Sequence, residues 1–363
     1  MYCWRNNIRG INMVGLLKYY IKKRAYIVGI ISIILILLAI LFFKDGYVHH
    51  VTCTQDLFPQ NDPIDHYAFI SSVLLLIVPM FEFSFKMRKV SIDEFYSFPI
   101  KREKLYIVKY IIGLLEVLIP MTVFFLFTLF DILLSPNVFY ISQYIVYYLL
   151  SIPTIAASYS IIAFIYAKCN TVHDGIINVI LVQFFFVGIA YIIGEIVSNR
   201  DICLITNNDY FTCRNYWSYF FIFSPMTRLS VYYTILMLYG KVSHLPGILY
   251  NNDIATIISM VFFLVIGIVS FILLITLQKY EKSEDSMDIS NSWFSYKVFI
   301  PTYIVILSTI CIYEKAPIFI LLVAILGYIL YAIYRRNLKI KLYDIITGLS
   351  CLVGGVILGA LIW

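Results

Sequence analysis

Residues 254–276 read Ile-Ala-Thr-Ile-Ile-Ser-Met-Val-Phe-Phe-Leu-Val-Ile-Gly-Ile-Val-Ser-Phe-Ile-Leu-Leu-Ile-Thr, without a charge or a proline. A helix of about 20 apolar residues is long enough to cross the hydrocarbon core of a bilayer. The whole chain has this character, because 61% of its 363 residues are hydrophobic and only 13% are charged, against roughly 25% charged in soluble domains. We therefore expect an all-α, polytopic transmembrane protein.

Stretches of this kind recur along the chain and predict about nine membrane spans. They are residues 25–43, 67–85, 106–134, 141–167, 176–197, 254–276, 298–314, 317–335 and 342–363. A further apolar stretch, 219–238, is interrupted by Pro225 and Arg228. We interpret it as a re-entrant segment or a helix lying flat at the surface, on the outer side in either case.

The basic residues between these segments predict the orientation. With the N-terminus inside, the loops on the cytoplasmic side carry 21 of the 27 Lys and Arg residues and the outer loops carry 6. This asymmetry follows the positive-inside rule. It predicts a multi-pass membrane protein with a cytoplasmic N-terminus, and it assigns the net charge of +6 to membrane orientation rather than to nucleic-acid binding.

The N-terminal segment 1–24 carries apolar residues at helical spacing, together with four basic residues at 18–24. The pattern is typical of an interfacial helix on an anionic inner leaflet. A charged flank that anchors the first span is the other interpretation.

Region 86–109, between the second and third spans, contains a short helix by local rules. Ser91 and Glu94 have the spacing of a capping box, and Pro99 disfavours helix before it and can open the next one. We expect a helix at about 92–97 with exposed aromatic side chains at Phe95 and Tyr96. Such side chains favour a partner's groove, or they fold back onto the inner leaflet.

The run Glu94-Phe-Tyr-Ser-Phe-Pro-Ile-Lys-Arg-Glu-Lys-Leu105, followed by Lys109 before a long apolar helix, resembles the segment after the second span of ABC-2-type exporter permeases. The resemblance implies a coupling helix at about 91–99 that docks into a separate ATPase subunit. The docking residues it implies are Ile92, Glu94, Phe95, Tyr96, Ser97, Pro99 and Arg102.

The same resemblance implies the domain plan. A six-span permease core would occupy 25–276, with an outer loop or re-entrant segment at 198–253. A cytoplasmic linker at 277–297 and a C-terminal transmembrane extension at 298–363 would follow. The permease would form a homodimer or heterodimer in the lipid bilayer.

The chain contains no phosphate loop of the form Gly-x-x-x-x-Gly-Lys-[Ser/Thr]. We therefore expect it to bind no cofactor itself, with ATP and Mg²⁺ on the partner subunit. No catalytic set or zinc spacing is evident, so an enzyme is disfavoured. The expected function is ATP-driven export of a hydrophobic or amphipathic cargo, such as an antimicrobial peptide, an antibiotic or a lipid-like molecule. The alternative is a non-transporting sensor or assembly partner that uses the same segment.

Two smaller features carry expectations of their own. Glu116 lies about ten residues into the third span, where a charge is costly, so it lines a cargo route or locks helices together. Cys203 and Cys213 are predicted outside, where a disulfide is permitted. The acids near span ends, among them Glu82 and Asp131, are expected to be solvated.

Overall fold

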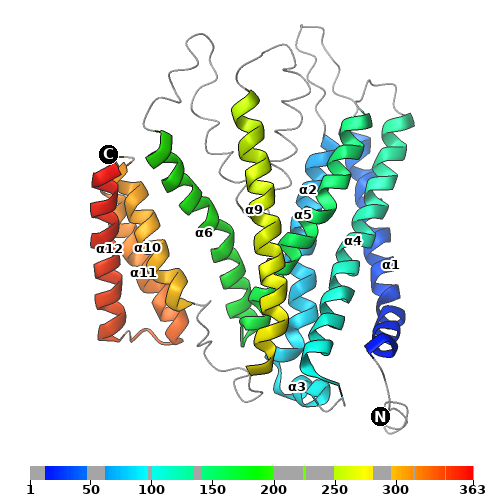
Figure 1. Cartoon of the computed structure of the whole chain (residues 1–363), viewed down its shortest axis with the longest axis horizontal. Helices are drawn as coiled ribbons and strands as arrows, with labels where there is room; N and C mark the ends of the chain where they lie inside the picture. The colour runs from blue at the N-terminus through cyan, green and yellow to red at the C-terminus, as the bar shows by residue number, and fades with distance from the viewer. Residues whose placement is uncertain are drawn as a thin grey trace. The chain divides into compact units, whose positions relative to one another are not determined.

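The computed structural model describes residues 13–46, 62–96, 100–134, 141–198, 224–225, 249–280, 296–313, 315–339 and 341–362, and within them every regular element is a helix (Figure 1). The long helices are α1 (Met13–Gly46), α2 (Asp62–Phe83), α4 (Arg102–Leu134), α5 (Ile141–Lys168), α6 (Val172–Ser198), α9 (Leu249–Thr276), α10 (Tyr296–Tyr313), α11 (Phe319–Arg335) and α12 (Leu342–Ile362). The short ones are η2 (Ser84–Met87), α3 (Lys89–Tyr96) and η6 (Leu277–Tyr280).

Each of the nine apolar segments expected from the sequence overlaps one of these long helices over nearly all of its length. In the described residues, seven helices are long and apolar enough to cross a membrane: α1, α2, α4, α5, α6, α10 and α12. The apolar stretches of α9 and α11, Met260–Thr276 and Phe319–Arg335, are shorter. The structure therefore confirms a helical protein embedded in a membrane, while the count of nine spans stays a prediction.

Several expectations fall outside the described residues. These are the interrupted stretch 219–238 apart from Ser224 and Pro225, the cysteines Cys203 and Cys213, and the linker from 281 to 295.

The N-terminal segment is continuous with the first span. Residues 13–24 and the apolar residues after them form one helical element, α1. Leu16 and Tyr20 are buried there, whereas Val14 and Ile21 are exposed. The segment is thus not a helix separate from the span.

The chain divides into two compact units. The first contains α1, α2, α3, α4, α9 and most of α5, and α4 contacts α1, α2 and α9 within it. Hydroxyl pairs link its helices, for example Tyr67 to Ser151 at 3.0 Å and Tyr110 to Ser160 at 2.7 Å. Such bonds between helices are a usual source of stability where the surroundings are apolar.

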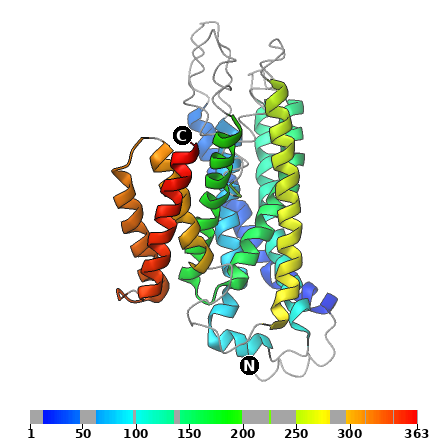
Figure 2. The ribbon, with the colours of Figure 1, turned by 60° about the vertical axis from the view of Figure 1, so that its left-hand side comes forward.

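The second unit contains α6, α10, α11 and α12, and the last three lie side by side (Figures 1 and 2). Two glycines of α12 let this helix pack closely against α10. A Cβ on Gly355 would lie 1.8 Å from Ser308 Oγ of α10, and one on Gly359 would lie 2.8 Å from Ile312 Cβ. Small residues four positions apart let apolar helices approach backbone to backbone, and Thr309 Oγ1 uses this approach to donate to the carbonyl of Gly355 at 3.1 Å.

Candidate functional site

The short helix α3 follows the end of α2 in the first unit, as Figure 1 shows. It runs from Lys89 to Tyr96, so it begins two residues before Ser91. The expected capping box is therefore wrong, because Ser91 lies inside the first turn. The helix η2 ends at Met87, so the chain already has helical geometry when α3 begins.

The next helix also begins later than expected. It starts at Arg102 rather than near Pro99, and the carbonyl of Lys101 accepts from the amides of Lys104 at 3.0 Å and Leu105 at 3.2 Å. Ser97, Phe98 and Pro99 lie outside the described residues, as does the side chain of Glu94.

The apolar side chains of α3 are turned toward the protein. Ile92 is 2% exposed, and the ring of Phe95 lies 4.8 Å from that of Phe85 in η2. The hydroxyls of Tyr96 and Tyr106 share a hydrogen bond of 3.4 Å. Phe95 and Tyr96 are thus half-buried rather than exposed as expected, because residues 92, 95 and 96 share one helix face and this face packs against the chain's own η2 and α4.

Arg102 takes part in the same packing. Its guanidinium carbon lies 4.3 Å from the centre of the Tyr96 ring, which is cation–π geometry. The described side chains that are exposed around α3 and the start of α4 are charged: Arg88, Asp93, Lys101 and Lys104. The outward surface of this segment is thus charged rather than aromatic.

Behind α3 lies a cluster of three buried charged residues and one half-buried arginine, which we call the charge cluster: Arg24 of α1, Glu82 of α2, and Lys109 and Glu116 of α4. Lys109 Nζ donates to Glu82 Oε2 at 3.1 Å. Arg24 Nη2 lies 2.7 Å from Glu82 Oε1, and Arg24 Nε lies 3.6 Å from Glu116 Oε1. Glu82 Oε1 accepts no hydrogen bond from any described residue. The contact between Arg24 and Glu82 is therefore an ion pair whose geometry is not that of a hydrogen bond.

The burial of this cluster makes its pairing necessary. Glu82 is 0%, Lys109 3% and Glu116 4% exposed. An ion that is moved out of water loses several kcal/mol of solvation free energy, and a partner of opposite charge must offset this loss. Two cations and two anions make the cluster neutral overall. The expectation that Glu82 is solvated is wrong, and the side chain of Asp131 lies outside the described part of the chain.

Lys109 joins the charge cluster to α3. Its ammonium lies 4.7 Å from the ring centre of Tyr20, 5.0 Å from that of Phe95 and 5.7 Å from that of Phe85. Aromatic faces within about 6 Å attract a cation. One side chain of α4 therefore contacts residues of α1, α2, η2 and α3.

Lys109, Gly113 and Glu116 lie at spacings of four and three, on one face of α4. Gly113 has a packing role there, because a Cβ on it would lie 2.0 Å from the hydroxyl of Tyr159 and 3.1 Å from Cγ of Glu82. Tyr159 of α5 is fully buried. The glycine thus lets α5 reach the charge cluster.

The sequence analysis did not find the cluster as a unit. Arg24 was counted only in the charge asymmetry, Glu82 only as an acid near a span end, and Lys109 only in the resemblance. A signal was present: opposite charges lie at the start of the first span, the end of the second and the start of the third, which must be on one side of the membrane. In the described residues, no group of three or more His, Cys, Asp or Glu could hold a metal ion.

Comparisons with known protein families, with curated proteins and with solved structures find no match. The class that the fold defines is a polytopic helical membrane protein.

Proposed function

We propose that the chain is the membrane-spanning subunit of an ABC-2-type exporter whose ATPase is a separate polypeptide. The observation that carries the proposal is the contact of Phe95 in α3 with Lys109, which in turn pairs with Glu82. A short helix between two spans is fastened through this lysine to a buried cluster, so a displacement of α3 would be passed to α1, α2 and α4.

The resemblance of 94–105 to the coupling segment of these permeases supports the same function. The packing of Phe95 and Tyr96 changes how docking would work, however. The ATPase would contact the charged outward surface of this segment, including Asp93, Lys101 and Lys104, rather than an aromatic face. The aromatic side chains would transmit the movement inward.

The cargo we propose is hydrophobic or amphipathic, consistent with the 31 Tyr and 28 Phe residues of the chain. The permease would work as a homodimer or heterodimer, with ATP and Mg²⁺ bound by the partner ATPase.

Co-purification of the full chain with candidate ATPase subunits tests the proposal, with the ATP hydrolysis rate of the complex as the second readout. The variant Asp93→Lys with Lys101→Glu and Lys104→Glu reverses the outward charge and leaves Ile92 and Phe95 in place. We expect it to weaken association at least tenfold. Lys315→Glu, an exposed lysine predicted on the opposite side, is the matched control and should associate normally.

The outcomes separate the two candidate functions. Association whose hydrolysis rate responds to cargo-containing liposomes supports an exporter. Association with an unchanged hydrolysis rate would favour the sensor or assembly partner. Equal association of the charge-reversed variant and the control would refute docking at this segment.

A further inference from the structure

The loop between α11 and α12 in the second unit is a basic segment held in a fixed shape. Its backbone folds back on α11, because the amide of Arg336 donates to the carbonyl of Ile333 at 3.1 Å and that of Asn337 to Ala332 at 3.2 Å. Asn337 Oδ1 accepts from the amide of Lys339 at 3.0 Å. The hydroxyl of Tyr328 donates to the carbonyl of Leu338 at 3.0 Å. These bonds fix the backbone of residues 336–339 against α11.

Two of the four cations in 335–341 are paired within the unit. Arg335 holds Asp344 through two bonds of 2.9 and 2.8 Å. Arg336 lies 3.4 Å from Asp174, which also accepts from the hydroxyl of Tyr296 at 3.0 Å.

The remaining two cations, Lys339 and Lys341, are exposed. Because Arg335 and Arg336 are matched by Asp344 and Asp174, the two lysines leave this loop with an excess of two positive charges. An excess of this size at the end of apolar helices attracts anionic headgroups.

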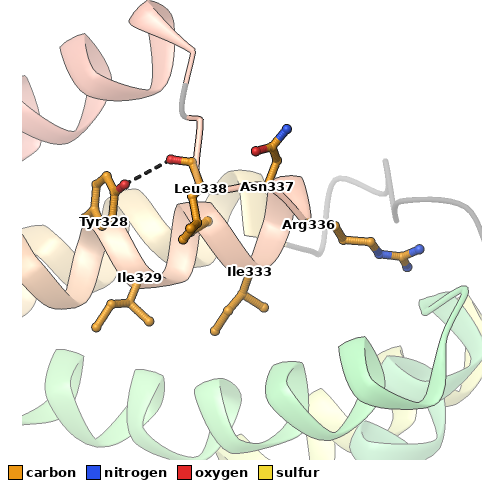
Figure 3. A pocket seen from close by; sticks show the side chains of 7 residues that line it. Tyr328, Ile329, Ile333, Arg336, Asn337 and Leu338 are labelled. Atoms are coloured by element: carbon orange, nitrogen blue, oxygen red, sulfur yellow. Dashed lines mark hydrogen bonds between the residues drawn. The ribbon is translucent and has the colours of Figure 1, made fainter.

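An apolar groove of about 360 Å³ opens beside this loop. Tyr328, Ile329, Ala332 and Ile333 of α11 line it together with residues 336–338. In Figure 3, Ile329 and Ile333 project from the same side of the helix, while Arg336 extends past its end. The groove is thus apolar along the helix and polar at the loop.

The apolar surface continues from the groove along α11. Leu322, Leu326, Ile329 and Ile333 follow one another at helical spacing, and all are exposed. From Leu322 to Ile333 the rise is about 16 Å at 1.5 Å per residue. One leaflet has a hydrocarbon depth of about 15 Å, half that of the bilayer. The stripe therefore matches the depth over which a phospholipid acyl chain needs apolar contact.

We propose that this groove and loop bind one anionic phospholipid, with an acyl chain along the α11 stripe and the phosphate headgroup at Lys339 and Lys341. The charge excess selects an anionic lipid over a zwitterionic one. The matching depth of the stripe favours a lipid over a soluble phosphate. This inference is independent of the proposed transport activity.

Native mass spectrometry of the purified full chain, titrated with phosphatidylglycerol or phosphatidylcholine, tests the proposal. We expect phosphatidylglycerol to be retained and phosphatidylcholine to be lost under the same activation. With Lys339→Gln and Lys341→Gln together, phosphatidylglycerol should bind about 30-fold more weakly. Both lysines are exposed, so the variant should fold. The control Lys315→Gln, at the other end of α11, should bind as the unaltered chain does.

A second variant tests the apolar half. Ile329→Trp fills the groove at a half-exposed position and should weaken retention while all cations stay in place. Glycerol phosphate, which has the headgroup charge but no acyl chain, should not compete with the lipid. Equal retention of the two lipids, or equal binding by the double-lysine variant and its control, would overturn the proposal. Competition by glycerol phosphate would overturn the lipid assignment in favour of a free anion.

Discussion

Replacement of Glu82 by glutamine is the sharpest test of the charge cluster, because this carboxylate is the partner of both of its cations, the buried Lys109 and the half-buried Arg24. At an effective dielectric constant of about 20, its attraction to Lys109 at 3.1 Å and Arg24 at 2.7 Å is worth roughly 5 and 6 kcal/mol. Removing the charge also removes its own desolvation cost, which offsets much of this attraction. Loss of one partner from a buried pair typically costs 3–5 kcal/mol. We expect Glu82→Gln to lower the free energy of unfolding by about 3–5 kcal/mol.

Glu116→Gln is the matched control for this variant. It removes a carboxylate of similar burial, but one that contacts only Arg24, at 3.6 Å, and leaves both contacts of Glu82 intact. We expect a smaller cost than for Glu82→Gln, because Arg24 is the one ion partner of Glu116 in the described residues and lies at the longer distance.

Titration from a mild detergent into dodecyl sulfate measures both free energies. The near-ultraviolet circular dichroism of the tyrosines can report unfolding, because Tyr20, Tyr106 and Tyr159 are buried in the first unit. If Glu82→Gln cost less than 1 kcal/mol, or if the two variants cost the same, the assignment of Glu82 as the centre of the cluster would be refuted.

Two further predictions concern glycines. Gly113→Ala should destabilise the chain by about 1–3 kcal/mol, because its Cβ would meet the hydroxyl of Tyr159. Adding Tyr159→Phe should recover part of this loss. Thermal unfolding of the two single variants and the double variant measures the recovery. Gly355→Ala should destabilise the second unit by a similar amount, because its Cβ would clash with Ser308. Gly354→Ala, whose Cβ would have nothing within 4 Å, should leave the melting temperature unchanged. An equal loss of stability in the two variants would contradict the close packing at Gly355.

The sequence was sufficient to predict the helices but not the contacts between them. A run such as 254–276 predicts a helix because its length and composition leave no other structure in a bilayer. The pairing of Arg24 with Glu82 depends instead on how two separate spans rotate about their axes. No local rule sets that rotation, so the sequence indicated only that these charges lie on one side of the membrane.

The short helix α3 was predicted in place, but the direction of its side chains was wrong. Ile92, Phe95 and Tyr96 form an apolar face that any nearby apolar surface can cover. The sequence does not tell whether that surface belongs to a partner, to the lipid or to the same chain. Phe85 and Tyr106, which cover it, lie in η2 and α4, and their approach follows from the tertiary fold.

The inward packing of α3 makes the proposed coupling mechanically more direct. An aromatic face that inserted into an ATPase would leave only the backbone to pass on a movement. Here Phe95 contacts Lys109, and the charge on Lys109 is held by Glu82. Because an unpaired buried charge costs several kcal/mol, this lysine cannot slide gradually away from its partner. A push on α3 would therefore move α2 and α4 together as one body, or leave them where they are, which is the two-state response that an exporter driven by an external ATPase requires.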